Sequence, residues 1–385
     1  MFLTPRMRVT ALAVAAAFVL GACSSAATTA PTTAPSAAPT ASGAATQAPG
    51  GGTPTVPSGN VTLQGAGATF PAPLYGTWFE AFSAKYPNIQ IDYQANGSGA
   101  GIKAITQQTV DFGASDAPMK DEEIAAVPSG AKILHVPTAL GAVVIIYNLP
   151  GVDNLQLDAA NVAGIYLGTI TKWNDPAIAA NNPGVTLPAT DILVVHRSDG
   201  SGTTNAFTTY LDTVSPDWHS QVGKGKEVKW PTGVGAQGND GVASGVKQTE
   251  GAVGYVELNY ATTAKLTSAK LKNADGNFVP GSTAGVTAAA EAAVDSFPAD
   301  FRQAPIINGA GADTYPIASY TYILIYQDQK DLAKAQALVA FLQWALTEGQ
   351  QGEEGLGYAP LPAAVQKMAL EELHTVTVGG SPVWP

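Results

Sequence analysis

Residues 61–93 read VTLQGAGATFPAPLYGTWFEAFSAKYPNIQIDY, and this stretch indicates the fold of the chain. Its apolar residues recur with a period typical first of a strand, then of an amphipathic helix, then of a second strand, and the alternation continues beyond it. We predict strands over 61–65, 89–93 and 110–114, with helices over 72–86 and 101–108 between them. Strands that alternate with helices in this way are typical of a parallel α/β sheet.

The rest of the chain continues this alternation. Further strands are predicted over 140–147, 192–196 and 317–326, and further helices over 159–167, 203–211, 241–249, 284–294, 330–347 and 362–373. From Asn60 onward the chain holds about 325 residues, which is more than one ordinary hydrophobic core accommodates. We therefore expect an α/β protein with two lobes.

The first 22 residues have the features of a secretory signal peptide. Two arginines precede an apolar run over 11–20, and small residues stand before Cys23. The run is about half the length that a membrane-spanning helix needs. Residues 20–23, Leu-Gly-Ala-Cys, resemble the cleavage box of bacterial lipoproteins, which predicts a lipid on Cys23, the single cysteine of the chain. The alternative is a plain secretory peptide with an incidental cysteine.

Residues 23–59 are expected to form a disordered tether between the lipid and the folded part. Apart from Cys23 they are almost wholly Ala, Thr, Pro, Ser and Gly, without a charged or aromatic residue. Such a segment buries too little apolar area to offset the entropy of ordering it. Two or three acyl chains on Cys23 would anchor the protein stably in a membrane.

The net charge of −11 narrows the range of partners. Acidity on this scale argues against nucleic acid and against electrostatic binding to anionic lipid. The sequence also lacks the GxxxxGK[ST] loop of nucleotide-binding proteins, metal-ligand spacing among its four histidines, and a GxSxG nucleophile elbow. We therefore expect no nucleotide, no metal, no cofactor and no catalytic residue. A serine hydrolase that uses Ser201 and His196 has only weak support.

Four glycine-containing stretches stand at the ends of predicted strands: 65–70 (GAGATF), 96–101 (NGSGAG), 113–118 (GASDAP) and 197–204 (RSDGSGTT). In open α/β sheets, ligands bind at the carboxyl ends of strands, where the free N–H groups of helix starts point at one spot. The hydroxyls of Ser98, Ser201 and Thr203 add donors. The planar guanidinium of Arg197 can grip two oxygens of a tetrahedral oxyanion. Together the stretches predict an oxyanion cage.

Each stretch taken alone also has an ordinary structural explanation. Glycine-serine segments often only turn the chain, Thr69 and Ser201 are typical helix caps, and a single arginine is more often ion-paired than a ligand. The functional interpretation depends on the occurrence of all four at strand-to-helix junctions. A cage of charge-assisted hydrogen bonds can outweigh the distant, screened negative charge of the surface.

Asp116 is an unexpected residue in a site for an anion. A carboxylate repels an anion unless the anion carries a proton to donate. Phosphate is protonated on one or two oxygens at neutral pH, whereas sulfate is not, so a buried acceptor would reject sulfate. We expect Asp199 to hold Arg197 in place. The alternative is that Asp116 only caps a local turn before Pro118.

Taken in order, these stretches resemble the phosphate-binding proteins of bacterial high-affinity phosphate ABC transporters. The likeness runs from Val61 to about Leu361 and includes several blocks in the same order: 65–73 (GAGATFPAP), 110–118 (VDFGASDAP), 199–203 (DGSGT), 238–241 (GNDG) and 251–257 (GAVGYVE). So many blocks in one order make the match specific.

The resemblance implies a type II periplasmic-binding-protein fold, in which two α/β lobes joined by two crossings close on one phosphate. The crossings are expected near residues 138–139 and 315–316. This places 60–138 and 316–385 in lobe I and 139–315 in lobe II, after a signal peptide over 1–22 and the lipidated tether over 23–59.

The resemblance also implies a set of phosphate ligands, with Asp199 as the acid that pairs with the arginine. The ligands are Thr69, Phe70, Ser98, Asp116, Arg197, Ser201, Gly202 and Thr203. Two departures from the family pattern are visible. Gly99 replaces the second serine of the turn at Ser98, and His196 stands where close relatives often have another basic residue. If His196 lies near the site, phosphate binding gains a pH dependence below about 6.5.

The function implied is capture of inorganic phosphate outside the cytoplasmic membrane by a monomeric, lipid-anchored protein. The phosphate would pass to the membrane permease of an ABC transporter, without catalysis. Within binding proteins the alternative is another tetrahedral oxyanion, such as sulfate or molybdate, against which Asp116 argues. A secreted phosphatase or hydrolase is less well supported, and a phosphate-sensing or adhesive surface protein on the same scaffold stays open.

Overall fold

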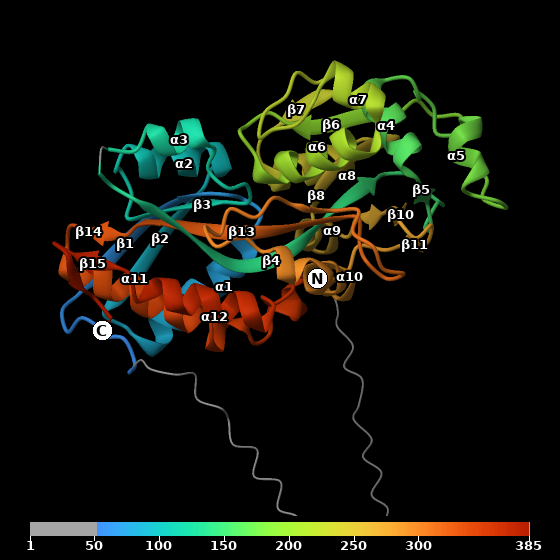
Figure 1. Ribbon diagram of the computed structural model, residues 1–385. Helices are drawn as coiled ribbons and strands as arrows, with labels where there is room; N and C mark the ends of the chain where they lie inside the picture. The colour runs from blue at the N-terminus through green and yellow to red at the C-terminus, as the bar shows by residue number, and fades with distance from the viewer. Residues whose placement is uncertain (1–51, 129, 385) are drawn as a thin grey trace, which may run out of the picture. The chain divides into compact units, whose positions relative to one another are not determined.

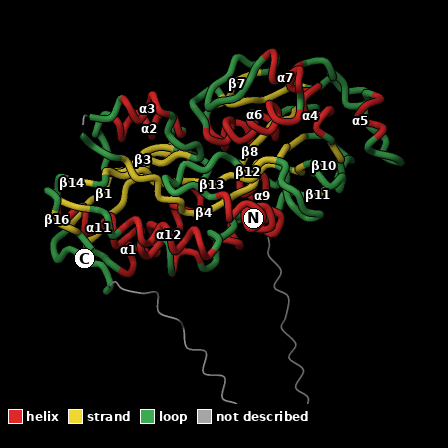
Figure 2. Tube along the Cα trace, in the orientation of Figure 1, coloured by secondary structure: helices red, strands yellow, loops and turns green. Residues whose placement is uncertain are grey.

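A ten-stranded mixed sheet forms the centre of the protein in the computed structural model, which describes residues 52–128 and 130–384. Eight strands follow one another across it in the order β2 (Ile89–Ala95), β1 (Val61–Gly67), β3 (Phe112–Ser115), β13 (Ile317–Tyr326), β4 (Ile133–Tyr147), β8 (Ala252–Glu257), β6 (Leu193–Arg197) and β7 (Val234–Ala236). Two short strands attach to this path, β12 (Ile306–Ile307) to β13 and β9 (Thr267–Ser268) to β4. Figure 2 shows the strands running through the middle of the molecule between helices.

The sheet contains two groups of strands, one on each side of β4. The first strand group consists of β2, β1, β3 and β13, and the second strand group consists of β8, β6 and β7. Within the groups β1 runs parallel to β2 and β3, and β6 runs parallel to β7 and β8. However, β13 is antiparallel to β3 and β4, and β4 is antiparallel to β8. The prediction of a parallel layer is therefore correct for β2, β1 and β3 and for β8, β6 and β7, and wrong at the centre of the sheet, where β13 and β4 run antiparallel to their neighbours.

The strand β4 belongs to both groups. It pairs with β13 over residues 133–142 and with β8 over residues 143–147, and all of its 15 residues are buried. The predicted strand over 140–147 is only its second half. The first half contains His135 and Pro137, which interrupt the apolar run that identifies a buried strand.

Helices cover both faces of the sheet (Figure 1). They are α1 (Ala72–Lys85), α2 (Ser98–Thr106), α3 (Asp121–Ala125), α4 (Ala159–Leu167), α5 (Pro176–Ala180), α6 (Gly202–Val214), α7 (Pro216–Gln221), α8 (Gly238–Gln248), α9 (Leu258–Ala264), α10 (Thr283–Ala293), α11 (Leu332–Ala345) and α12 (Ala363–Leu373). In the first strand group α1 and α11 lie on one face and α2 lies on the other (Figure 1). The helices α6 and α8 pack on the second group.

The predicted helices all exist, with shifted ends in most cases. The prediction over 159–167 matches α4, and the strand predicted over 317–326 matches β13. Four short helices (α3, α5, α7 and α9) were not predicted, because five to seven residues give too little periodicity. Two small sheets were not predicted either: β5 (Gln156–Leu157) with β10 (Lys270–Lys272) and β11 (Phe278–Val279), and β14 (Asp328–Gln329) with β15 (Thr377–Val378) and β16 (Ser381–Pro382).

Several sequence predictions fall outside this part of the chain. The signal peptide, Cys23 and most of the tether lie outside the described residues, and residues 52–59 contain neither helix nor strand. Within 52–128 and 130–384, no helix is both long enough and apolar enough to cross a membrane. The lobe boundaries at 138–139 and 315–316 stay a prediction.

Candidate functional site

The four predicted stretches meet where strands of both groups end. Six predicted ligands come together here, from the segments after β1 and β3, the first residue of α2, the last residue of β6 and the segment after it. The residues are all at most 4 % exposed: Thr69, Ser98, Asp116, Arg197, Ser201 and Thr203. The carboxyl ends of parallel strands share one edge of a sheet, which explains the convergence within each group. The two strand groups are held close to each other at this site by hydrogen bonds between their residues.

Asp116 lies directly after β3 and is 2 % exposed. Its Oδ1 accepts a hydrogen bond of 2.8 Å from the hydroxyl of Thr321, and its Oδ2 lies 3.3 Å from Oγ of Ser98. Burial raises the pKa of Asp116 to about 7, against the opposing effects of the Thr321 hydroxyl, the charge of Arg197 and Ser98. The carboxyl group is therefore close to the midpoint of its titration at neutral pH. The alternative of a simple turn cap does not account for these long-range contacts.

Ser98 and Gly202 connect the two strand groups at this site. The N–H of Gly202 donates to Oγ of Ser98 over 3.0 Å, and the N–H of Gly99 donates to the carbonyl of Gly200 over 2.8 Å. A Cβ atom on residue 202 would stand 2.5 Å from both Cβ and Oδ2 of Asp116. Only glycine therefore permits this approach.

Arg197 ends β6 and is held by Asp199. Its Nε donates to Oδ1 of Asp199 over 2.8 Å, its Nη2 donates to Oδ2, and its Nη1 lies 3.5 Å from the hydroxyl of Thr203. Burial raises the pKa of Asp199, but the hydrogen bonds and charge of Arg197 outweigh this and keep the pKa below its ordinary value. The predicted supporting role of Asp199 toward Arg197 thus has a matching geometry. Asp199 also accepts from the N–H of Gly238.

Ser201 and Thr69 differ in how their hydroxyls are used. Ser201 is the N-cap of α6, because its Oγ accepts from the N–H of Thr204 over 3.0 Å, and its O–H proton stays available for another acceptor. Thr69 does not cap α1, whose N-cap is Pro71. Its Oγ1 instead accepts from Nδ2 of Asn239 over 2.9 Å.

The contribution of the Phe70 backbone N–H to the site stays a prediction, but the position of this backbone is well defined. The ring of Phe70 is fully buried, and its carbonyl accepts a 2.7 Å hydrogen bond from the hydroxyl of Tyr358. The hydroxyl of Tyr260 donates to the carbonyl of the neighbouring Thr69 over 2.5 Å. Two tyrosines distant in sequence therefore fix the loop between β1 and α1.

Sequence reasoning did not identify Asn239 as a residue of the site. It is the second residue of α8 and is fully buried, and its Nδ2 donates to the hydroxyls of Thr69 and Thr203 at 2.9 and 3.2 Å. Its Oδ1 accepts from the N–H of Glu257. The available signal was the GNDG block at 238–241, which carried only family resemblance and no assigned role.

His196 is turned away from the site. Successive side chains of a strand point to opposite faces of the sheet, and the imidazole stacks on Trp230 with 4.8 Å between ring centres. Burial lowers its pKa, against the effect of the Arg197 carbonyl, which lies 3.0 Å from Nδ1. The pH dependence suggested for this residue stays a prediction, without a contact to the cage in its support.

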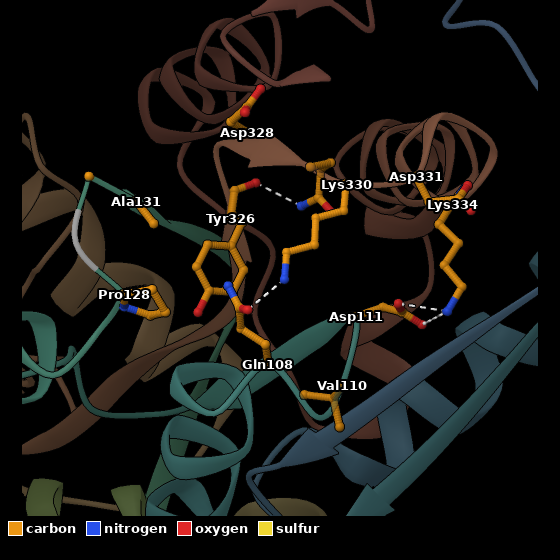
Figure 3. A pocket seen from close by; sticks show the side chains of 12 residues that line it. Gln108, Val110, Asp111, Pro128, Ala131, Tyr326, Asp328, Lys330, Asp331 and Lys334 are labelled. Atoms are coloured by element: carbon orange, nitrogen blue, oxygen red, sulfur yellow. Dashed lines mark hydrogen bonds and ion pairs between the residues drawn. The ribbon is translucent and has the colours of Figure 1, made fainter. Parts of the chain in front are cut away.

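A separate hollow of about 420 Å³ lies between β3, β14 and the start of α11 (Figure 3). Its lysines already have partners, since Lys334 pairs with Asp111 at 2.9 Å and Lys330 donates to Gln108 at 2.5 Å. None of the predicted ligands lines it. The predicted oxyanion site around Asp116 is therefore separate from this hollow.

Within 52–128 and 130–384, no group of three or more His, Cys, Asp or Glu side chains is arranged to hold a metal ion. The cage combines one guanidinium, several hydroxyls and helix-start N–H groups with one carboxyl. Buried donors of this kind are suited to an oxyanion, and a single acceptor among them would select for a proton on it.

A family model for a PBP superfamily domain matches residues 30–348. Two groups of strands that share a buried polar site between them are the architecture of a substrate-binding protein, and the chain belongs to this superfamily. Within it, the sequence is 43% identical over 310 residues to the phosphate-binding protein PstS of Xylella fastidiosa (strain 9a5c), covering 80% of this chain and 84% of that protein. The chain belongs to the PstS phosphate-binding protein family.

Other relatives agree with this assignment, and solved structures agree with the fold. PstS of Haemophilus influenzae is 42% identical over 308 residues, 79% of this chain and 90% of that protein, and PstS of Methanocaldococcus jannaschii is 37% identical over 353 residues, 85% and 90%. The solved structure of the phosphate-bound periplasmic protein PfluDING has a TM-score of 0.67 at 22% identity, over 84% of this chain and 96% of that one. A phosphate-binding protein of Stenotrophomonas maltophilia has a TM-score of 0.65 at 23% identity, with the same coverage. The predicted periplasmic-binding-protein fold is thus confirmed.

Proposed function

We propose that this protein captures inorganic phosphate outside the cytoplasmic membrane and delivers it to the permease of an ABC transporter, without catalysing a reaction. The observation that carries the proposal is a buried carboxyl, Asp116, among converging donors. Membership of a family whose relatives are named phosphate-binding proteins supports it.

In this proposal, hydrogen bonds to the phosphate oxygens replace hydrogen bonds that the proposed ligands now make with one another. The proposed ligands are the side chains or N–H groups of Thr69, Phe70, Ser98, Asp116, Arg197, Ser201, Gly202 and Thr203. Asp199 orients Arg197, and Asn239 orients two of the hydroxyls. Ionised Asp116 accepts the phosphate proton. Support for this set is the burial and mutual contact of its members.

The first test is calorimetric titration of the full chain with phosphate and then with sulfate. At pH 8 we expect tight phosphate binding and no sulfate binding, because ionised Asp116 faces an unprotonated sulfate oxygen without a proton between them. As the pH falls below about 7, Asp116 becomes protonated, so that it can donate a hydrogen bond to sulfate. Sulfate binding should therefore appear on acidification. Equal affinity for both anions at pH 8 would exclude the role given to Asp116 and favour a general oxyanion carrier.

We further propose that lobe I (60–138 and 316–385) and lobe II (139–315) close over the phosphate, and that α3 fastens the closed form. Among the described residues, two ion pairs join these lobes, and both begin at α3. Asp121 pairs with Arg302 at 2.6 Å, and Glu123 pairs with Lys226 at 2.7 Å. The side chain of Lys226 is only 10% exposed, so solvent screens its pair less than an ordinary surface pair.

Replacement of Lys226 by methionine should accelerate phosphate release about fivefold, because a partly buried pair contributes about 1 kcal/mol to the closed form. Stopped-flow displacement of phosphate at two salt concentrations measures this, and the wild-type rate should rise with salt. Lys85→Met is the matched control, since Lys85 pairs with Glu348 within lobe I. Equal effects of the two variants would refute the proposed fastening role of α3. The proposal that the protein binds phosphate would not be affected by that result.

The remaining parts of the proposal concern the anchor. A signal peptide over 1–22 and a lipid on Cys23 would place a monomer at the outer face of the cytoplasmic membrane, with residues 23–59 as the tether. The family of the chain supports an extracytoplasmic location and a permease partner. Metabolic labelling with a radioactive fatty acid, compared between the wild type and Cys23→Ala, tests the anchor.

A further inference from the structure

The carboxyl group of Asp116 is held from β13, a strand that comes 205 residues later in the sequence. The antiparallel pairing of β13 with β3 sets Tyr322 opposite Ser115, so that Thr321 comes opposite Asp116. The hydroxyl of Thr321 donates to Oδ1 of Asp116 over 2.8 Å. The hydroxyl of Ser319 donates to the backbone carbonyl of Asp116 over 3.1 Å. One strand therefore contacts both the carboxyl group and the backbone of the residue proposed to select phosphate.

An irregularity in the sheet fixes the position of Thr321. The register between β13 and β4 shifts at Thr321, which pairs with Ala139 while Tyr322 pairs with Pro137, so Thr138 is an extra residue in β4. Such bulges re-aim side chains and commonly stand next to functional sites. The hydroxyl of Thr138 donates to the carbonyl of Thr321 over 3.2 Å and lies 2.8 Å from the hydroxyl of Tyr75. The contact from Thr138 holds the backbone of Thr321 at this position.

The two carboxyl oxygens of Asp116 have different surroundings. Oδ1 is occupied by Thr321, and Oδ2 lies on the side of Ser98 and Gly202, where the predicted ligands converge. A hydroxyl that donates to a carboxylate favours its ionised form. An ionised carboxylate can only accept a hydrogen bond, whereas a neutral carboxyl also donates one. The charge state of Asp116 thus decides whether the site distinguishes a protonated anion from a bare one.

Burial opposes this ionised state. The pKa of Asp116 is raised by burial to about 7, and the Thr321 hydroxyl is the largest influence that lowers it, ahead of Arg197 and Ser98. Five further titratable groups act on or around Asp116: Tyr75 of α1, Tyr93 of β2, Glu257 of β8, Tyr260 of α9 and Tyr358. Burial raises the pKa of each. The tyrosines therefore stay neutral at physiological pH, and Arg197 is the cation that faces Asp116.

We propose that Thr321 is a specificity-determining positioning residue, whose hydroxyl keeps Asp116 an acceptor and thereby makes the site reject unprotonated oxyanions. The inference rests on the proposed function and adds to it the residue that maintains the selectivity. Thr321 acts through Asp116 and is not itself a ligand. If Thr321 only fills space in the sheet, its replacement will leave the anion selectivity unchanged.

The test compares Thr321→Val with Thr321→Ser and Ser319→Ala in the full chain. Valine has nearly the shape of threonine without the hydroxyl, serine keeps the hydroxyl, and Ser319→Ala removes a hydroxyl that contacts only backbone. Calorimetry with phosphate and with sulfate at pH 6, 7 and 8.5 gives the ratio of the two affinities. Thermal unfolding without ligand shows that each variant folds.

We expect Thr321→Val to shift the affinity ratio at pH 7 toward sulfate by about tenfold or more, since one pKa unit is a tenfold change in protonation. The onset of sulfate binding should move to higher pH. Thr321→Ser should restore the wild-type ratio and onset, and Ser319→Ala should leave both unchanged. If Thr321→Val does not fold, Thr321→Ala removes the same hydroxyl and must give the same shift.

Two results would overturn the inference. One is a folded Thr321→Val protein with the wild-type ratio and pH profile. The other is an equal shift in Ser319→Ala, which would indicate general loosening of the sheet. Failure of the wild type to bind phosphate would instead refute the proposed function, so the two failures can be told apart.

Discussion

Replacement of Arg197 by alanine should weaken phosphate binding by about 3 kcal/mol or more, which is over a hundredfold in the dissociation constant. Arg197 is 3 % exposed, and its guanidinium is a buried cation that faces Asp116. Its loss would remove the proposed charge-assisted contact with phosphate and would leave Asp199, which now accepts two hydrogen bonds from Arg197, without its partner beside an incoming anion. Calorimetric titration with phosphate measures the change.

Arg197→Lys provides the graded control for this prediction. Lysine keeps the positive charge but loses the planar fork that engages Asp199 and phosphate at the same time. Its affinity should therefore fall between those of the wild type and Arg197→Ala. A folded Arg197→Ala protein that binds phosphate within tenfold of the wild type would place the anion elsewhere.

The second large effect is expected from Gly202→Ala. The added Cβ would lie 2.5 Å from Cβ of Asp116 and 2.8 Å from its Cα, and neither atom can move without moving β3. The backbone of residue 202 is not in the left-handed region, so alanine causes no strain there by itself. Overpacking of this kind costs about 1–3 kcal/mol, a loss of roughly fivefold to over a hundredfold in phosphate affinity.

Gly241→Ala is the matched control for this substitution. Residue 241 also lies in a helix, but a Cβ there would meet its nearest neighbour at an ordinary 3.5 Å. Its phosphate affinity should stay near that of the wild type. Thermal unfolding without phosphate should be similar for both variants, because the clash at residue 202 arises at a contact between the two strand groups. Wild-type affinity in Gly202→Ala would show that this contact does not form in the bound state.

The sequence predicted the cage well because each of its parts carries a local signal. Glycines and hydroxyl residues after an apolar strand are recognisable within ten residues, as at Thr69, Ser98, Asp116 and Ser201. The contacts that connect these parts have no such signal. Thr321 lies inside an otherwise ordinary β-strand pattern, and only the register of β13 against β3 brings it to Asp116. Sequence spacing contains no information about that register.

Other features of the structure were also missed from the sequence, for related reasons. The antiparallel direction of β13 and β4 in the sheet was not predicted, because a buried strand gives the same apolar run in either direction. The strand β8 was recognised only as a family motif at 251–257, although it pairs with both β4 and β6. Asn239 was overlooked because an asparagine at a helix start usually serves the helix. Here its side chain reaches across to Thr69.

The course of β4 has a consequence for how the folded state is maintained. The same 15 residues form the ladder with β13 and the ladder with β8, without a loop between the two. Loss of either part of this strand would leave its neighbour, β13 or β8, with an unpaired edge, and buried unpaired peptide groups are costly. We therefore expect the two strand groups to unfold together, so that one free energy of unfolding describes both.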